Sequence, residues 1–185
     1  LTEQKADLQE AKETLFQVID EMDEEMKRRF KETFDGISNE FEAVFQQLFG
    51  GGRAEVKLTD PDDLLNTGVE IIAQPPGKKL QNLGLLSGGE RALTAIALLF
   101  SILIVRPVPF CVLDEVEAAL DEANVQRFSQ YLRKFSSQTQ FIVITHRKGT
   151  MESADVLYGI TMQESGVSKL VSVRLEDKKI AEQTK

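Results

Sequence analysis

Residues 110–115 read Phe-Cys-Val-Leu-Asp-Glu, four apolar residues followed by two acids. An uninterrupted apolar run of this length is typical of a strand that is buried on both faces. A helical pattern over residues 121–135 follows, and then a second wholly apolar strand over residues 141–144. Strands of this kind that alternate with helices form a parallel sheet between helices. The sequence therefore predicts an α/β fold with a mostly parallel sheet flanked by helices.

Two carboxylates end the first of these strands. Asp114 and Glu115 would lie at the carboxyl edge of the sheet, where open α/β sheets bind their ligands. Further acids bring the set to five within residues 114–122: Asp114, Glu115, Glu117, Asp121 and Glu122. Such a cluster repels itself unless a cation is present, and Mg²⁺ is a hard ion held by carboxylates together with phosphates. The alternative is a polar turn that opens the next helix.

His146, the only histidine in the chain, follows the second strand. A strand–helix–strand crossover makes both strands parallel, so they end at the same edge of the sheet. We therefore expect His146 to face the same crevice as Glu115. Thr145, Arg147 and Lys148 would add hydrogen-bond donors for a phosphate there. Without this topology, a lone histidine after a strand would be read as a turn residue.

Residues 85–91 read Leu-Leu-Ser-Gly-Gly-Glu-Arg and precede an uncharged run over residues 92–105. Ser87 and Glu90 match a capping box that opens a helix. Two glycines in the first helical turn each lower helix propensity by about 1 kcal/mol relative to alanine, so capping alone does not explain them. A bare helix start presents free N–H groups to a phosphate. The uncharged run is shorter than the roughly 20 residues of a membrane span, and we expect a buried core helix over residues 88–105.

The first 49 residues predict one long helix. Leu1, Leu8, Leu15 and Met22 recur every seven residues, and an apolar pattern resumes one residue out of phase from Phe30 onward. We interpret residues 1–49 as a coiled-coil arm whose second half docks onto a globular body, residues 50–176, with a flexible tail over residues 177–185. Within the body, short strands are predicted near residues 54–58 and 69–73, and a closing hairpin near residues 156–162 and 170–175.

Charge is unevenly distributed along the chain. Of 30 acidic and 22 basic residues, 13 acidic and 6 basic ones fall within residues 1–50. The remainder is nearly neutral, so the net charge of -8 does not exclude contact with nucleic acid. The single cysteine, Cys111, fits a reducing compartment. The sequence starts without methionine or a secretory leader, and we expect an excised fragment of a cytoplasmic protein.

A phosphate-cradling loop of the form G-x-x-x-x-G-K-[ST] is missing. The pair Gly77-Lys78 lacks the upstream glycine and the hydroxyl residue, and Gly50-Gly51-Gly52-Arg53 fails in the same way. The chain therefore holds half of a nucleotide site.

Four segments in order carry a resemblance. They are Leu86-Ser87-Gly88-Gly89-Glu90, Phe110 to Glu115, Ala119-Leu120-Asp121 and Ile144-Thr145-His146. This set resembles the signature motif, Walker B motif, D-loop and switch histidine of an ABC-type ATPase. With the arm in front, the chain is similar to the C-terminal lobe of the head of a bacterial chromosomal SMC (structural maintenance of chromosomes) protein. The resemblance spans essentially all 185 residues.

The resemblance implies roles for individual residues. In this family two heads sandwich two ATP molecules, and each head combines an N-terminal Walker A lobe with a C-terminal lobe. Ser87, Gly88, Gly89 and Glu90 would then bind the nucleotide held by the opposite head, and Asp121 would bridge the heads. Asp114 would hold Mg²⁺, Glu115 would act as general base, and His146 would sense the γ-phosphate. The isolated chain would be inactive as an ATPase.

The resemblance also implies partners. These are the N-terminal lobe of the same protein, a second head in a homodimer, DNA, and a kleisin subunit whose C-terminal domain would dock at strands 156–175. DNA would meet Lys78, Lys79, Arg147 or Lys148, and no membrane is involved. The expected process is chromosome condensation and segregation in the cytoplasm, at the nucleoid. Two alternatives remain: the half-head of a coiled-coil DNA-repair ATPase, and a catalytically silent scaffold.

Overall fold

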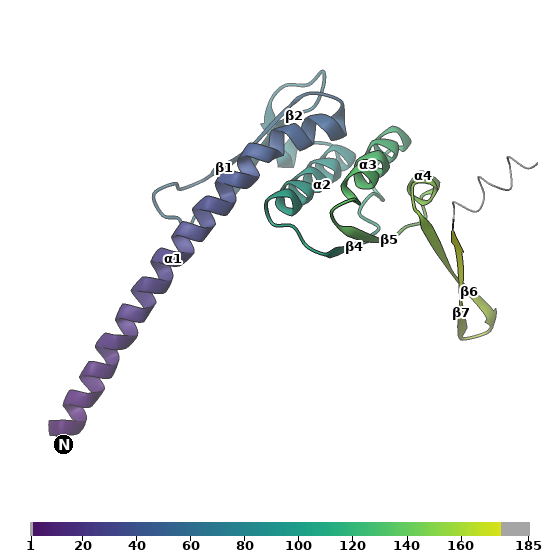
Figure 1. Cartoon of the computed structure of the whole chain (residues 1–185). Helices are drawn as coiled ribbons and strands as arrows, with labels where there is room; N and C mark the ends of the chain where they lie inside the picture. Colours follow the sequence, from purple (N-terminus) through teal and green to yellow (C-terminus); the bar gives the residue numbers. More distant parts are fainter. Residues whose placement is uncertain (1, 175–185) are drawn as a thin grey trace, which may run out of the picture.

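The computed structural model describes residues 2–174. A long helix leads into a body of helices and short strands, and a hairpin projects from the far side of that body (Figure 1). The elements in chain order are α1 (Thr2–Phe49), β1 (Arg53–Leu58), β2 (Val69–Gln74), β3 (Gln81–Asn82), the 3-10 helix η1 (Leu83–Leu85), α2 (Gly88–Val105), β4 (Phe110–Asp114), α3 (Glu122–Phe135), β5 (Gln140–Ile144), α4 (Lys148–Glu152), β6 (Val156–Glu164) and β7 (Val167–Arg174).

The two halves of α1 differ in their surroundings. Its first half extends away from the body (Figure 1), and the side chains of Leu8, Leu15 and Met22 are exposed there. Its last turns belong to the core, with Phe41 and Phe45 fully buried. The structure thus has one continuous helix whose last turns pack into the core. The exposed heptad leucines are the surface that a second helix of a coiled coil would cover.

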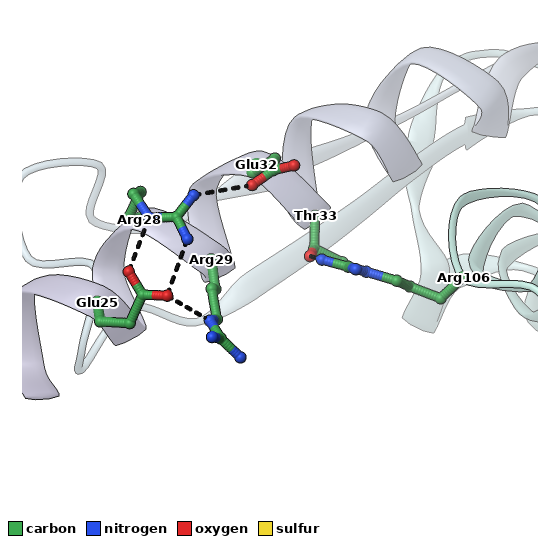
Figure 2. Close-up of polar contacts among 6 residues, drawn as sticks. All are labelled: Glu25, Arg28, Arg29, Glu32, Thr33 and Arg106. Carbon is green, nitrogen blue, oxygen red and sulfur yellow. Dashed lines mark hydrogen bonds and ion pairs between the residues drawn. The ribbon is translucent and has the colours of Figure 1, made fainter.

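The end of α2 lies close against the middle of α1. A Cβ built on Gly36 would stand 3.0 Å from Cγ1 of Val105, so the absence of a side chain allows this approach. The guanidinium of Arg106, just after α2, donates to the hydroxyl of Thr33 at 3.1 Å (Figure 2). The arm is thus fixed to the body at the end of α2 opposite the Ser-Gly-Gly sequence.

Ion pairs stabilise the exposed stretch of α1 just before this junction. Glu25 accepts hydrogen bonds from Arg28 at 2.8 Å and Arg29 at 2.6 Å, and Arg28 also pairs with Glu32 (Figure 2). The hydrogen bonds from Arg28 and then Arg29 lower the pKa of Glu25 to about 2. Pairs at these helical spacings stabilise an exposed helix only weakly.

The core is built on α2, the central helix. Phe100 packs against aromatic rings of α3 and β5, and Leu93, Ile96 and Ala97 are buried beside it. Among residues 2–174, α2 is the one helix whose length and hydropathy would allow it to cross a membrane. Its packing in the core confirms the expectation of a buried core helix over residues 88–105.

Within residues 2–174 the strands form three separate sheets. Sheets β1-β2-β3 and β6-β7 are antiparallel, and β4 and β5 are the one parallel pair in this part of the chain, joined by the α3 crossover. The α/β class and the crossover are therefore confirmed, whereas the mostly parallel sheet was wrong for the described residues. Short connections between β1 and β2 and between β6 and β7 favour antiparallel hairpins, since a parallel pair needs a long crossover.

One face of the parallel pair is left uncovered by residues 2–174. Leu113 is buried against the helices, whereas Phe110, Val112, Ile142 and Ile144 on the other face are at least half exposed. We predicted helices on both faces of this sheet, and within the described residues only one face is covered. The prediction followed from the apolar character of the whole strand. This pattern does not reveal which polypeptide supplies the element that packs on the second face.

Element boundaries agree closely with expectation. The predicted helices over residues 88–105 and 121–135 correspond to α2 and α3, and the hairpin corresponds to β6 and β7. The short elements β3 and α4 were missed, because two-residue strands and single-turn helices carry no periodic signal. The predicted tail, residues 177–185, and the end of the hairpin at Leu175 lie outside the described residues.

Candidate functional site

Glu115 and His146 meet at the carboxyl ends of β4 and β5. The imidazole Nδ1 lies 3.2 Å from Oε1 of Glu115, although 31 residues separate the two in sequence. Both side chains are open to solvent, with 55% of Glu115 and 65% of His146 exposed. The expectation that these two residues lie together at the end of a parallel pair is confirmed.

The backbone of Glu115 has an unusual conformation. Its φ is +48°, and it is the one non-glycine residue with positive φ in residues 2–174. Its N–H donates to the carbonyl of Ile144 at 3.0 Å, which extends the β4–β5 ladder by one bond. Non-glycine residues in the left-handed region are uncommon and concentrate at functional sites, because the surrounding structure must hold them there.

Asp114, the last residue of β4, offers an uncommitted carboxylate. Its side chain is exposed and makes no hydrogen bond or ion pair with any residue of the described part of the chain. Mg²⁺ usually takes one or two carboxylates and completes its shell with water and substrate phosphates. A single open carboxylate next to Glu115 fits this donor set. A site made by protein ligands alone is not present in residues 2–174, where no group of three or more candidate ligands converges.

The five acids within residues 114–122 do not form one cluster. Glu117 is fully buried, and its Oε1 accepts from the hydroxyls of Thr145 at 2.5 Å and Thr150 at 3.0 Å. Asp121 caps α3 by accepting from the backbone N–H of Asn124 at 2.8 Å. The prediction of a self-repelling cluster that needs a cation was wrong, because the chain turns inward after Glu115 and then opens a helix.

The buried contacts of Glu117 were not foreseen. In sequence this residue is one more acid in an acidic run, and neither threonine has a spacing that points to it. Only the fold reveals the arrangement, because β4 and β5 bring the two segments together.

The first turn of α2 is exposed at the surface. Ser87 accepts from the N–H of Glu90, and the Glu90 carboxylate accepts from the N–H of Ser87 at 3.0 Å, so the predicted capping box is confirmed. A Cβ on Gly88 would meet no atom within 4 Å, whereas one on Gly89 would stand 3.0 Å from the carbonyl oxygen of Ala119. Gly88 therefore leaves backbone open to an approaching molecule, and Gly89 allows the contact with the loop after β4.

Two of the basic residues considered for DNA contact are held within the chain. Lys78 pairs with the Glu90 carboxylate at 2.9 Å. The guanidinium of Arg147 donates to the carbonyl of Leu120, so it faces the loop before α3. Lys148 is exposed and pairs with Glu152 of the same helix at 3.4 Å, and Lys79 is exposed, so these two remain as candidates from that set.

The capping carboxylate is kept charged by its neighbours. The hydrogen bond from Lys78, followed by those from the side chain and backbone of Ser87, lowers the pKa of Glu90. A carboxylate committed to Lys78 and Ser87 is less available to a nucleotide than we expected from sequence. The direct effect of the Glu90 carboxylate is to fix the exposed first turn of α2.

Comparison with known proteins places this arrangement in a family. The family model described as "RecF/RecN/SMC N terminal domain" matches residues 4–169. The "Chromosome partition protein Smc" of Bacillus subtilis (strain 168) is 79% identical over 97% of this chain, and that of Lactiplantibacillus plantarum is 65% identical over the same share. This chain spans 15% of the length of each of these relatives.

Solved structures give the same result. A chain from "Structural biochemistry of ATP-driven dimerization and DNA stimulated activation of SMC ATPases" aligns with a TM-score of 0.74 and 42% identity, over 85% of this chain and 96% of that one. The Pyrococcus furiosus "Smc head domain with an extended coiled coil bound to the C-terminal domain of ScpA" aligns with a TM-score of 0.79 and 42% identity, over 93% of this chain and 43% of that one. The resemblance to SMC proteins is confirmed: this chain belongs to the RecF/RecN/SMC family and has the fold of an SMC head domain.

Proposed function

We propose that this chain is the C-terminal lobe of an SMC head, which hydrolyses ATP only when an N-terminal Walker A lobe and a second head complete the site. The observation that carries this proposal is the Glu115–His146 pair, at 3.2 Å on an open sheet edge, in a sequence that contains no phosphate-cradling loop. The matching family model is described as an N terminal domain. The lobe assignment rests instead on the motifs present here and the one that is missing.

The uncovered face of β4 and β5 supports a second lobe. Its side chains, Phe110, Val112, Ile142 and Ile144, form an apolar surface beside the proposed site. Contiguous exposed apolar surface on a folded protein marks an interaction site. The Walker A lobe would cover this face and bring its phosphate loop next to Asp114 and Glu115. The coverage of 96% of one solved SMC chain by this chain supports a lobe of this size.

We infer a role for each group at the strand ends from their positions. Asp114 would hold Mg²⁺, which neutralises charge on the nucleotide phosphates when bound. Glu115, exposed and held in its left-handed conformation, would take a proton from the attacking water. His146 lies within hydrogen-bond distance of Glu115 and would contact the γ-phosphate. Most of the catalysis is positioning, so the fixed backbone of Glu115 is an advantage.

The exposed tip of α2 would serve a different nucleotide. The open backbone at Gly88 lies at the positive end of the helix dipole, next to the exposed capping residue Ser87. In an engaged pair this tip would bind the γ-phosphate held by the opposite head, and Asp121 would lie at the junction. Each ATP would then need both heads, so hydrolysis would be coupled to their separation.

The hairpin β6–β7 would bind a kleisin C-terminal domain. Tyr158, Ile160 and Met162 share one face of this hairpin with Leu170, and all four are exposed. A two-stranded hairpin is marginally stable in water by itself, so an apolar face of this size favours a covering partner. Together with DNA, this partner would link ATP turnover to chromosome condensation and segregation at the nucleoid of the cytoplasm.

Other readings of the same fold are less well supported. A catalytically silent scaffold would not need an open carboxylate at Asp114 next to a Glu115–His146 pair. A DNA-repair ATPase would share the chemistry and differ in its partner, and the relatives named above are chromosome partition proteins. Binding to a kleisin C-terminal domain would distinguish a chromosomal SMC head from a DNA-repair ATPase.

A mixing experiment tests the proposal. Phosphate release is measured for this chain alone, for a Walker A lobe alone, and for their mixture. We expect turnover only in the mixture, and its loss in a mixture that carries Glu115→Gln. Glu122→Gln, an exposed acid in the first turn of α3, is the matched control and should keep turnover. Hydrolysis by this chain alone, or a stable complex of the two lobes that fails to hydrolyse ATP, would refute the proposal.

A further inference from the structure

We infer that the buried carboxylate of Glu117 is a positioning residue that fixes Glu115 and His146 relative to each other. The inference rests on the proposed ATPase function and adds to it a residue that touches neither nucleotide nor water. Glu117 lies two positions after Glu115, and its partner Thr145 directly precedes His146. The same carboxylate therefore joins the two segments that carry the catalytic pair.

The contacts of Glu117 are buried and specific. Its Oε1 accepts two hydroxyl hydrogen bonds, from Thr145 at 2.5 Å and from Thr150 at 3.0 Å. Glu117 and Thr150 are both almost completely buried, at 0% and 5% exposed. The hydroxyl of Thr145 in turn accepts from the backbone N–H of Arg147 at 3.0 Å. The turn that follows β5 is thus anchored to a single carboxylate oxygen.

A second connection runs in the opposite direction. The side chain of Arg147 donates to the carbonyl of Leu120, while the N–H of Leu120 donates to the carbonyl of Glu117 at 3.0 Å. The loop after β4 and the turn after β5 are therefore tied to each other twice. Each tie involves a residue directly next to His146 in sequence, Thr145 in one and Arg147 in the other.

Exposure explains why such an anchor matters. Glu115 and His146 are more than half exposed, so core packing does not hold their side chains in place. Their positions depend on the two backbone segments that carry them. A displacement of about 1 Å can lower a catalytic rate by as much as about 100-fold, so fixing those segments has a direct effect on turnover.

Stability alone does not account for a glutamate at this position. None of the ion pairs in residues 2–174 involves Glu117, and its Oε2 is buried with no hydrogen-bond partner there. Burying a carboxylate without a cation is costly, and apolar side chains of similar volume often give a more stable protein. Compared with an apolar side chain, the Glu117 carboxylate adds two hydrogen bonds from hydroxyl groups, those of Thr145 and Thr150.

The test uses the reconstituted head and two variants of Thr150, whose side chain donates to Glu117. Thr150→Val keeps the volume and removes the hydroxyl, whereas Thr150→Ser keeps the hydroxyl and removes a methyl group. Thr139→Val is the matched control. Thr139 is equally buried and donates to the carbonyl of Val108 at 3.0 Å, but it lies at the opposite end of β5 from His146.

We expect Thr150→Val to lower kcat by about tenfold with the KM for ATP unchanged within twofold, and Thr150→Ser to restore most of the turnover. Thr139→Val should lower the melting temperature to a similar extent and keep kcat. Glu117→Met, which removes both acceptor oxygens, should lower kcat at least as much as Thr150→Val. The double variant should have a kcat less than twofold below that of Glu117→Met alone. Such non-additivity would assign the loss of kcat to the contact between Glu117 and Thr150.

The outcomes separate this inference from the proposed function. If the wild-type head hydrolyses ATP and Glu115→Gln does not, but Thr150→Val keeps kcat within twofold, Glu117 is a structural residue only and the inference is wrong. The inference is equally wrong if Thr150→Ser loses turnover and Thr150→Val keeps it, since packing would then be the cause. A wild-type head that fails to hydrolyse ATP overturns the proposed function, and the inference with it.

Discussion

The carbonyl oxygen of Ala119 lies against Gly89, 3.0 Å from the position that a Cβ would take on that residue. The loop after β4 therefore touches the first turn of α2 at a place where only glycine fits without adjustment. Gly88, one residue earlier, faces open space. The two neighbouring glycines thus have different structural effects. Gly89 allows packing within the chain, and Gly88 leaves backbone open at the surface.

This difference predicts opposite effects of alanine on stability. Gly88→Ala should stabilise the folded chain by about 0.5 kcal/mol, because alanine has the higher helix propensity and meets no other atom. Gly89→Ala should lose this gain or destabilise, because its methyl group presses on the Ala119 carbonyl. Urea denaturation of both variants measures the difference. Equal stabilisation by the two would show that the loop moves aside freely.

Glu115→Gln should separate ATP binding from hydrolysis. The amide keeps the size of the side chain but does not accept a proton, and loss of a general base lowers turnover by about 100-fold or more. ATP should still bind, and the engaged pair of heads should persist for longer. Nucleotide binding, phosphate release and the lifetime of the ATP-bound dimer are measured on the reconstituted head. Unchanged turnover would remove Glu115 from the mechanism.

Ser87→Arg should block engagement of two heads. Ser87 is exposed at the tip of α2, where a long cationic side chain would occupy the space that a second head needs. Binding of ATP to a single head should remain, because this tip serves the opposite nucleotide. Sedimentation in the presence of ATP measures dimer formation. Ser87→Gly separates loss of the hydroxyl from the steric effect, since it removes the cap without adding bulk and costs only a few tenths of a kcal/mol.

The Glu90 cap should stabilise the protein at neutral pH and lose this effect in acid. Because Lys78 and Ser87 lower the pKa of Glu90 below its ordinary value of 4.5, its contribution is complete above pH 4.5 and falls as the pH drops through the lowered pKa. Glu90→Gln should therefore lower the melting temperature at pH 7, and the gap to wild type should narrow towards pH 3. Glu42→Gln, on α1, should show no such gap, because Glu42 makes no hydrogen bond or ion pair within residues 2–174.

Ile160→Asp should weaken binding of a kleisin C-terminal domain. Ile160 is 70% exposed on the apolar face of β6–β7, so the substitution adds charge to a surface without disturbing a core. Thr161→Asp places the same charge on the opposite face of the hairpin and should bind normally. Calorimetric titration compares the two variants with wild type. Equal affinities would show that the kleisin domain binds a different surface.

Much of the framework could be predicted from local patterns. The capping box at Ser87 marks the start of α2, and the prolines at 107 and 109 follow its end. The crossover through α3 placed Glu115 and His146 at one edge, because a connection of that length makes the strands parallel. Periodicity and topology together were therefore sufficient to bring the two residues together.

The surroundings of the site could not be predicted in the same way. An acid such as Glu117 reads as solvent-facing, and its burial depends on Thr145 and Thr150, which come from other segments. The sheet was expected to be mostly parallel because β4 and β5 are apolar throughout. That composition indicates that both faces of the strands are packed against other elements. It does not indicate whether those elements belong to the same polypeptide.

The apolar faces of β4–β5 and β6–β7 have a practical consequence for handling the protein. Uncovered strands with apolar side chains are templates for self-association, and their hazard grows with concentration. A preparation of this chain by itself should precipitate as it is concentrated, whereas production alongside a lobe that shields Val112 and Ile142 should keep it dispersed. Synthesis of the two pieces in the same cell is therefore the sensible route to material for crystals or kinetics.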